Sequence, residues 1–298
     1  MKRPLIALLL SGWLLSPTLY ATDRPAPKRQ RPPNDDSRLF LKVYGYYGLV
    51  APGSYRLTSN VSSFGSGTSN KNAFEQSQGI GVGLRAGLGL GYIVSDIINL
   101  GLDAEYCLPA SIEAPGSFTS SGVSGSSVGQ STQTFTYEFV TLTPNITLKA
   151  ITKADYYIYS RVGLSVVLPL TFQRGYTSTS ATTTGTKTTQ TAFDYQYDYK
   201  GKIDLGFQSA LGVQFSAGTK IRVFGEVVFN AYTFNPSGST YTSISSSATS
   251  PTTTSTLEYI YQKSGEYVST PGAKTVTVQQ ERFQANSLGV AVGLAYRF

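Results

Sequence analysis

The stretch from Gly79 to Tyr92, GIGVGLRAGLGLGY, decides the fold class of this chain. Its even positions are Ile, Val, Leu, Ala, Leu, Leu and Tyr, and its odd positions are all Gly except for Arg85. Side chains of a β-strand alternate between two faces, whereas a helix repeats about every 3.6 residues. The stretch therefore predicts a strand with one apolar face and one nearly bare face.

The same alternation recurs in other segments of the chain. They begin near Leu39, Leu100, Val140, Ile158, Ile203, Ile221 and Leu288. With the first stretch they predict eight strands. In the second and last of these strands the weaker face is Gly and Ala, which suits a crowded interior better than a hydrated exterior. A water-soluble barrel would cover its outside with Lys and Glu, so we expect the apolar face to meet lipid.

The connections between these segments alternate in length. Short ones lie at residues 95–99, 151–155 and 216–220, and long ones, rich in Ser, Thr and Gly, lie at 51–77, 109–134, 173–192 and 234–273. Tight periplasmic turns with long external loops are typical of outer-membrane barrels, and only a closed barrel pairs every backbone group of a membrane-spanning sheet. Residues 38–298 are therefore predicted to form an all-β, antiparallel up-and-down, eight-stranded transmembrane β-barrel.

The first 37 residues have a different composition. Residues 1–21 place Lys2 and Arg3 before an apolar run that ends near Ala21, which predicts a secretory signal peptide cleaved after that alanine. Residues 22–37 are rich in proline and arginine and predict a basic periplasmic tether. Such a tether is either a solvated spacer or a contact for anionic lipid or cell-wall polymer.

Charged residues fall on the inward phase of several strands. They are Lys42, Arg85, Asp103, Glu105, Arg161 and Glu226. Charges in a narrow lumen need partners, so we expect a structural salt-bridge network, with a gate or selectivity ring as the alternative. Eight strands enclose a space that side chains can fill, and Phe40, Tyr44 and Tyr46 should cover the neighbouring glycines. The lumen is thus expected to be largely plugged, with Cys107 as a small packed residue.

Outward aromatic residues are expected where the strands leave the hydrocarbon, because an apolar ring with a polar edge suits that interface. This predicted aromatic girdle comprises Tyr47, Tyr92, Tyr106, Tyr156, Phe172, Phe215, Phe229 and Tyr296. The outward phase of Ile203 and Leu205 also extends backwards through Tyr199, Tyr197, Tyr195 and Phe193, and Val276 and Val278 keep the phase of the last strand. Both extensions predict a tyrosine-rich collar above the membrane.

The composition argues against enzymatic and metal chemistry. The chain has no histidine and one cysteine, which removes the commonest general base, the commonest metal ligand and any cysteine-cluster site. We predict no catalytic residue, no metal and no cofactor. The sequence also offers no basic stripe for nucleic acid.

The last five residues, LAYRF from Leu294 to Phe298, alternate and finish on an aromatic residue. This end resembles the C-terminal assembly signal of the small eight-stranded outer-membrane barrels, such as the OmpA transmembrane domain and the OmpW-like and opacity-like porin-type proteins. The resemblance implies a Gram-negative outer membrane with loops facing outside. It also implies that the barrel-assembly machinery reads Tyr296 and Phe298.

The expected function follows from a plugged lumen beneath long loops. We expect a monomeric barrel with a structural or surface-recognition role, in which Ser- and Thr-rich loops such as 177–191 and 240–256 contact an extracellular partner. The alternative is a narrow channel or conduit for small or apolar solutes.

Overall fold

The computed structural model describes residues 37–50, 80–122, 125–150, 156–247, 250–262 and 274–298. The predicted signal peptide, the tether up to residue 36 and the predicted connections 51–77 and 151–155 lie outside the described residues. The chain divides into two compact units, and all described residues belong to the second, Ser37–Phe298.

The regular structure of the described residues is β-sheet, as predicted. Its strands are β1 (Leu39–Val50), β2 (Gly83–Ile93), β3 (Ile98–Gly122), β4 (Gly125–Lys149), β5 (Tyr156–Thr184), β6 (Lys187–Lys200), β7 (Asp204–Ser216), β8 (Ile221–Phe234), β9 (Gly238–Ser247), β10 (Ser250–Gln262), β11 (Thr275–Gln279), β12 (Phe283–Gln284) and β13 (Ser287–Arg297). Among these residues there is no helix long and apolar enough to cross a membrane. The described chain has thirteen strands where the sequence predicted eight.

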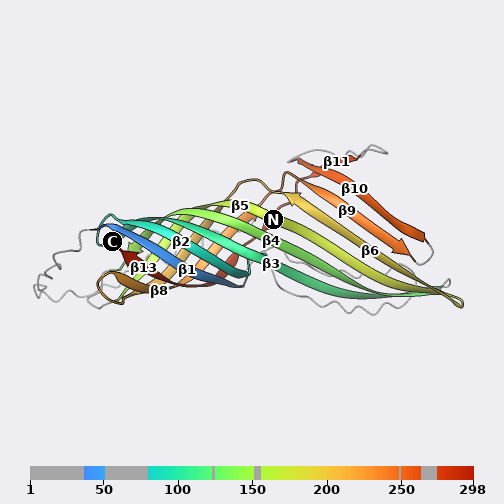
Figure 1. Cartoon of the computed structure of the whole chain (residues 1–298), viewed down its shortest axis with the longest axis horizontal. Helices are drawn as coiled ribbons and strands as arrows, with labels where there is room; N and C mark the ends of the chain where they lie inside the picture. Colours follow the sequence, from blue (N-terminus) through green and yellow to red (C-terminus); the bar gives the residue numbers. More distant parts are fainter. Residues whose placement is uncertain (1–36, 51–79, 123–124, 151–155, 248–249, 263–273) are drawn as a thin grey trace, which may run out of the picture. The chain divides into compact units, whose positions relative to one another are not determined.

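Antiparallel pairings join part of the sheet into a closed ring (Figure 1). They run from β1 through β2, β3, β4, β5, β7, β8 and β13 and return to β1. Each alternating run recognised in the sequence lies mainly within one of these strands. Closure leaves no unpaired edge where the ring strands meet.

Large side chains of β1 fill the ring beside glycines of its neighbours. Tyr44 lies opposite both Gly87 of β2 and Gly293 of β13, and its ring occupies the place that a Cβ at Gly87 would take. Phe40 covers Gly91 in the same way. The predicted covering of the bare glycine face is therefore confirmed.

The two faces of the ring differ in polarity. On the outside, Leu88 is 57% exposed and Leu205 is 75% exposed, whereas inside Asp103 is 0% and Arg161 2% exposed. This is the reverse of a water-soluble protein, in which charged side chains are almost never fully buried unless paired. The prediction that the apolar face points away from the lumen is confirmed.

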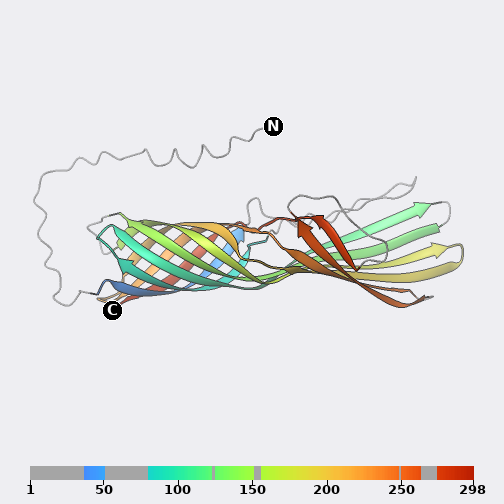
Figure 2. The same ribbon diagram turned by 90° about the horizontal axis from the view of Figure 1, so that it is seen from above.

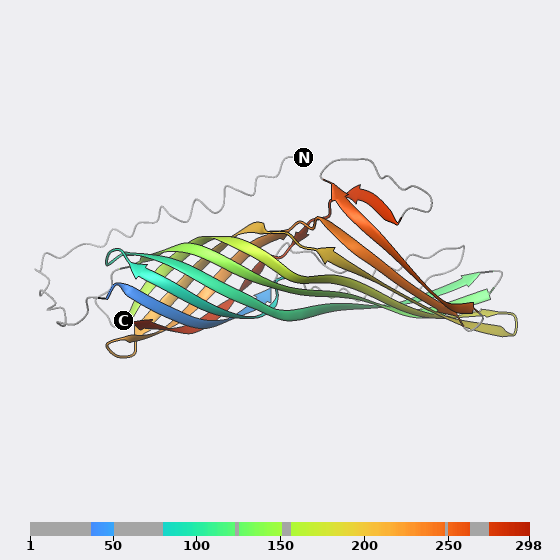
Figure 3. The ribbon, with the colours of Figure 1, turned by 45° about the horizontal axis from the view of Figure 1, so that its top comes forward.

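Three ring strands continue far beyond the ring. The pairing of β2 with β3 ends at Arg85 and Cys107, but β3 and β4 stay paired up to Gly122 and Gly125. The distal parts of β3, β4 and β5 join β6, β9, β10 and β11 in a projecting sheet, which Figures 1 to 3 show from three sides. We call this part the extended sheet.

Three of the predicted long loops, 109–134, 173–192 and 234–273, are mainly strand in the described residues. The candidate binding loops 177–191 and 240–256 lie within the last two of them and are also mainly strand. Threonine is β-branched and favours extended backbone, and cross-strand hydroxyls pair within the sheet. The polarity of these segments reflects two solvent-accessible faces and not irregular backbone.

The phase of the tyrosine segment is also corrected. Tyr199 is 8% exposed and lies on the lumen side, whereas Leu205 faces outward. The two belong to different strands, because residues 201–203 between β6 and β7 are not strand and the alternation breaks there. Val276 likewise lies in β11, which pairs in parallel with β10 and is not a continuation of β13.

Candidate functional site

Six charged side chains predicted to face the lumen lie together inside the ring, in what we call the charged layer (Lys42, Arg85, Asp103, Glu105, Arg161 and Glu226). Arg161 Nη1 lies 2.7 Å from Asp103 Oδ2, and Arg161 Nη2 lies 2.6 Å from Glu226 Oε2. Lys42 Nζ lies 2.9 Å from Asp103 Oδ1. Arg161 therefore links carboxylates from β3 and β8 across the ring.

Neutral residues complete this layer, and of these the sequence analysis singled out only Tyr44. Tyr44 donates to Glu105 at 2.9 Å, and Tyr159 donates to Glu226 at 2.8 Å. Gln208 donates to Glu105 at 2.8 Å and accepts a hydrogen bond from Arg161. The signal that could have found Gln208 is its place, as a polar residue, on the inward phase of the run from Ile203.

Arg85 is the member of the charged layer that contacts aromatic rings. Its guanidinium lies 4.8 Å from the ring centroid of Tyr46 and 5.1 Å from that of Phe139. Nη2 donates to the carbonyl of Gly81 at 3.2 Å and to Ser287 Oγ at 3.1 Å, while Nη1 lies 3.9 Å from Glu105 Oε2. The arginine therefore contributes more to cation–π packing than to an ion pair.

Beyond Arg85 lies a buried aromatic cluster, which we call the aromatic cap. Its aromatic members are Phe135, Tyr137, Phe139, Phe172, Tyr199, Tyr232, Phe234 and Phe283. The ring centroids of Phe135 and Phe172 are 4.8 Å apart, and those of Phe172 and Phe283 are 5.3 Å apart. Phe283 belongs to β12, which pairs with the end of β8, and Ile80 is fully buried in the same cluster.

Phe172 is the member of the predicted girdle that the structure places elsewhere. It is 4% exposed inside the aromatic cap. Pairing between β4 and β5 slips between Glu138 and Phe139, so that Glu138 faces Thr171 and Phe139 faces Pro169. A bulge of this kind adds a residue to one strand and reverses the phase beyond it, and the sequence pattern does not reveal it.

The other girdle residues lie on the outer face of the ring. Tyr47, Tyr92, Tyr106, Tyr156, Phe215 and Tyr296 are between 39% and 49% exposed, and Phe229 is partly exposed. Tyr156 and Phe215 pair across β5 and β7 with ring centroids 5.8 Å apart. Tyr296 and Phe298 also contact each other, at 5.5 Å. Their roles in anchoring and assembly stay predictions.

Beside the charged layer, the lumen holds a cavity of about 20 Å³, lined by residues that include Phe40, Lys42 and Arg161. That is about the space that one water molecule needs. Cys107 is buried, as expected for a small packed side chain.

The lumen-side face of the extended sheet carries a group of tyrosines, which we call the tyrosine face (Tyr176, Tyr195, Tyr197, Tyr199, Tyr241, Tyr259 and Tyr261). The ring centroids of Tyr197 and Tyr241 are 4.9 Å apart, as are those of Tyr176 and Tyr195. Burial raises the pKa of Tyr197 above its ordinary value, and the neighbouring Tyr259 raises it further. Burial likewise raises the pKa of Tyr261 to about 12, against the opposing hydrogen bond with Ser239.

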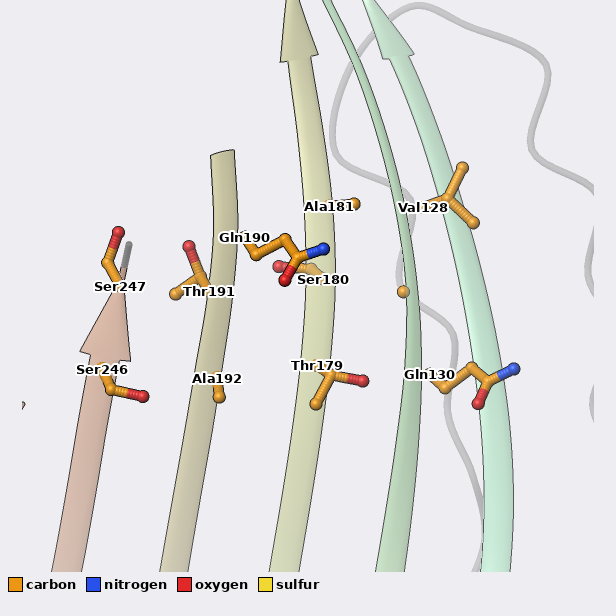
Figure 4. A pocket seen from close by; sticks show the side chains of 11 residues that line it. Val128, Gln130, Thr179, Ser180, Ala181, Gln190, Thr191, Ala192, Ser246 and Ser247 are labelled. Carbon is orange, nitrogen blue, oxygen red and sulfur yellow. The ribbon is translucent and has the colours of Figure 1, made fainter. Parts of the chain in front are cut away.

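A hollow of about 580 Å³ crosses β4, β5, β6 and β9 near the far end of the extended sheet (Figure 4). It is lined by short or neutral side chains, among them Gln130, Thr179, Ala192 and Ser246. In the part of the chain that the structure describes, no group of acidic, cysteine or histidine side chains could hold a metal ion.

The fold and the lumen define a closed antiparallel ring with an apolar exterior and a charged interior. Comparison with known protein families gives no match, and comparison with curated proteins gives no relative. Solved structures with some likeness include the Ralstonia pickettii toluene transporter TbuX, at 11% identity over 87% of this chain and 88% of that one, with a TM-score of 0.18. A Pseudomonas aeruginosa FadL homologue is 8% identical over 88% of this chain and 91% of its own, with a TM-score of 0.19. The Pseudomonas putida toluene transporter TodX is 9% identical over 88% and 90%, with a TM-score of 0.17.

Scores this low carry no argument about the activity of this chain. Membership of the small eight-stranded family that the C-terminal residues resemble is not shown by these comparisons.

Proposed function

We propose that this chain is an eight-stranded barrel of the bacterial outer membrane, with a closed lumen that anchors a sheet for recognition outside the cell. The observation that carries the proposal is the contrast between the two parts of β3, β4 and β5. Their ring portions surround a filled interior, whereas their distal portions join β6, β9, β10 and β11 in the extended sheet.

The membrane assignment rests on the outer face and on strand length. The ring strands expose Leu90, Leu164 and Val292 at 51%, 69% and 63%, which is costly in water and favourable in hydrocarbon. A tilted strand needs about 9 to 11 residues to cross a bilayer. β2 and β13 have 11 residues each, and β1 has 12.

The proposal of a closed lumen is supported by how the charges are held. Lys42 contacts Asp103, Asp103 contacts Arg161 and Arg161 contacts Glu226, each at hydrogen-bonding distance. The aromatic cap covers the far side of Arg85. Breaking a buried pair leaves an uncompensated charge, which costs several kcal/mol. In this proposal the barrel is the membrane anchor, and the extended sheet is the part that recognises a partner.

A second function, a conduit for small or apolar solutes, is favoured by a continuous series of aromatic rings. Tyr199 lies 6.2 Å from Tyr197 on the tyrosine face and 5.0 Å from Phe283 in the aromatic cap. If the segment at Phe283 moved, an apolar solute could pass along these rings from the extended sheet into the part of the lumen next to the aromatic cap. The charged layer would still block its way through the ring.

Planar-bilayer recording of the refolded full chain separates the two functions. A closed anchor gives no steady conductance, and surface labelling of intact cells reaches a cysteine placed on the extended sheet at Thr254. Steady conductance in the wild type, raised further by Arg161→Ala, would favour the channel instead. A labelling signal that appears only after the cells are broken would contradict the proposed orientation. We expect a monomer inserted by the barrel-assembly machinery.

A further inference from the structure

We propose that the tyrosine face binds neutral carbohydrate chains, an inference that rests on the proposed exposure of the extended sheet outside the cell. Four adjacent strands contribute the rings. Tyr176 lies on β5, Tyr197 on β6, Tyr241 on β9 and Tyr259 on β10, and β5, β6, β9 and β10 pair in this order.

The rings form a connected platform. Tyr176 and Tyr195 are nearly parallel, with an angle of 15° between their planes. Tyr197 contacts both Tyr241 and Tyr259, at 4.9 and 5.9 Å between centroids. These side chains are half-buried in the described structure, so each combines an apolar ring with a polar hydroxyl edge. Pyranose rings have the same combination, with apolar C–H faces and hydroxyl edges.

Hydroxyl groups extend this face toward the far end of the sheet. Ser243 and Ser255 lie 2.7 Å apart, and the next pair along the same strands, Ser245 and Thr253, also lies 2.7 Å apart. Ser243 stands opposite Tyr195 in the β6–β9 register, so these hydroxyls share the face of the tyrosines. Hydroxyls both donate and accept hydrogen bonds, which suits a polyol.

The acidic side chains of β6 and β10 lie on the face opposite the tyrosines. Asp194 and Asp198 alternate with the tyrosines of β6 and lie on the opposite face. Glu258 also lies on that opposite face, where it forms an ion pair with Lys200. Two charged groups border the tyrosine face: Arg174 of β5 stands opposite Tyr197, and Glu281 accepts a hydrogen bond from Tyr199. The rings and hydroxyls that form the face itself are neutral, which suits a neutral ligand.

The dimensions suit a short oligosaccharide. Neighbouring strands are about 4.8 Å apart and residues advance about 3.3 Å along a strand. The four strands thus span roughly 14 Å, and the segment from Tyr195 to Tyr199 spans roughly 13 Å. A platform of this size accommodates a few sugar rings.

The test uses the refolded full chain in detergent, with maltoheptaose and cellohexaose as probes and calorimetry as the readout. We expect at least one probe to bind, and Tyr197→Ala or Tyr241→Ala to weaken binding at least tenfold. Tyr197→Phe should retain most of the affinity because the ring remains. The matched control is Ile244→Ala, which removes an exposed apolar side chain from the opposite face of β9 and should leave binding unchanged.

A second measurement uses the wild-type chain, so its result does not depend on whether the variants fold. The bound probe should slow iodination of Tyr197 and Tyr241, located by mass spectrometry, but not that of Tyr47 on the ring. If neither oligosaccharide binds or protects these rings, or if toluene alone does, the carbohydrate site does not exist. That result would leave the closed anchor intact, because the bilayer recording tests it separately.

Discussion

The guanidinium of Arg161 lies 2.6 Å from the carboxylate of Glu226, and both side chains are 2% exposed. The two residues come from β5 and β8, which are separated in the ring by β7. This contact therefore spans one intervening strand on the inner wall, and together with the Arg161–Asp103 contact it ties β3, β5 and β8 to one another.

Replacing Arg161 with Ala should lower the free energy of unfolding by about 3 to 5 kcal/mol, because Asp103 and Glu226 would stay buried without their partner. Urea unfolding of the refolded protein measures the change. Lys200→Ala is the control: its ion pair with Glu258 is about half exposed, and such pairs contribute about 1 kcal/mol or less. Equal free energies of unfolding for the two variants would show that the charged layer does not stabilise the barrel.

Replacing Gly87 with Ala should destabilise the ring by about 1 to 3 kcal/mol, because the new Cβ would overlap the ring of Tyr44. Gly45→Ala is a closely matched control, since a Cβ there meets nothing within 4 Å. The midpoint of the loss of heat-modifiable migration on gels compares the two. A larger loss of stability in Gly45→Ala than in Gly87→Ala would show that Tyr44 does not pack against Gly87.

Placing Arg at Val292 should impair insertion by about 2 to 4 kcal/mol, since this side chain is proposed to face the centre of the membrane. Ile244→Arg alters another exposed apolar residue, on the extended sheet, and should be tolerated. Outer-membrane yields of the two variants test the assignment. Normal yields of Val292→Arg would mean that the outward phase of β13 does not meet lipid.

Deleting Phe298 should also reduce the outer-membrane yield if the C-terminal residues act as the assembly signal.

The tyrosine face should respond to alkaline pH. Burial raises the pKa of Tyr261 to about 12, whereas an unperturbed tyrosine titrates near 10. The folded form thus holds the proton more tightly, so the stabilisation is complete below about pH 10 and is lost as the pH rises through about 12. Subtracting the 295 nm absorbance titration of Tyr261→Phe from that of the wild type should isolate a step near pH 12. A step near pH 10 would show that Tyr261 is not held in this environment.

The sequence by itself determined the class of secondary structure and the inward side of the ring. Alternation in Gly79 to Tyr92 is a local property of the chain, so a period of two is visible without any contact. The same phase placed Arg85, Asp103, Glu105 and Arg161 inside, where the structure brings them together. The bare glycines of β2 also predicted a bulky neighbour, and Tyr44 of β1 occupies that place.

Tertiary structure alone decided where this phase changes and how far the strands run. The slip at Glu138 and the break at residues 201–203 reverse the facing of Phe172 and Tyr199, because a single added residue moves every later side chain to the other face. The Ser- and Thr-rich segments are strands because distant segments pair with them, as β9 does with β6. Alternation of Tyr195, Tyr197 and Tyr199 predicts a strand, as the structure shows. Which distant segments pair with that strand leaves no periodic signal, so the extended sheet and the face that its tyrosines share become visible only in the folded chain.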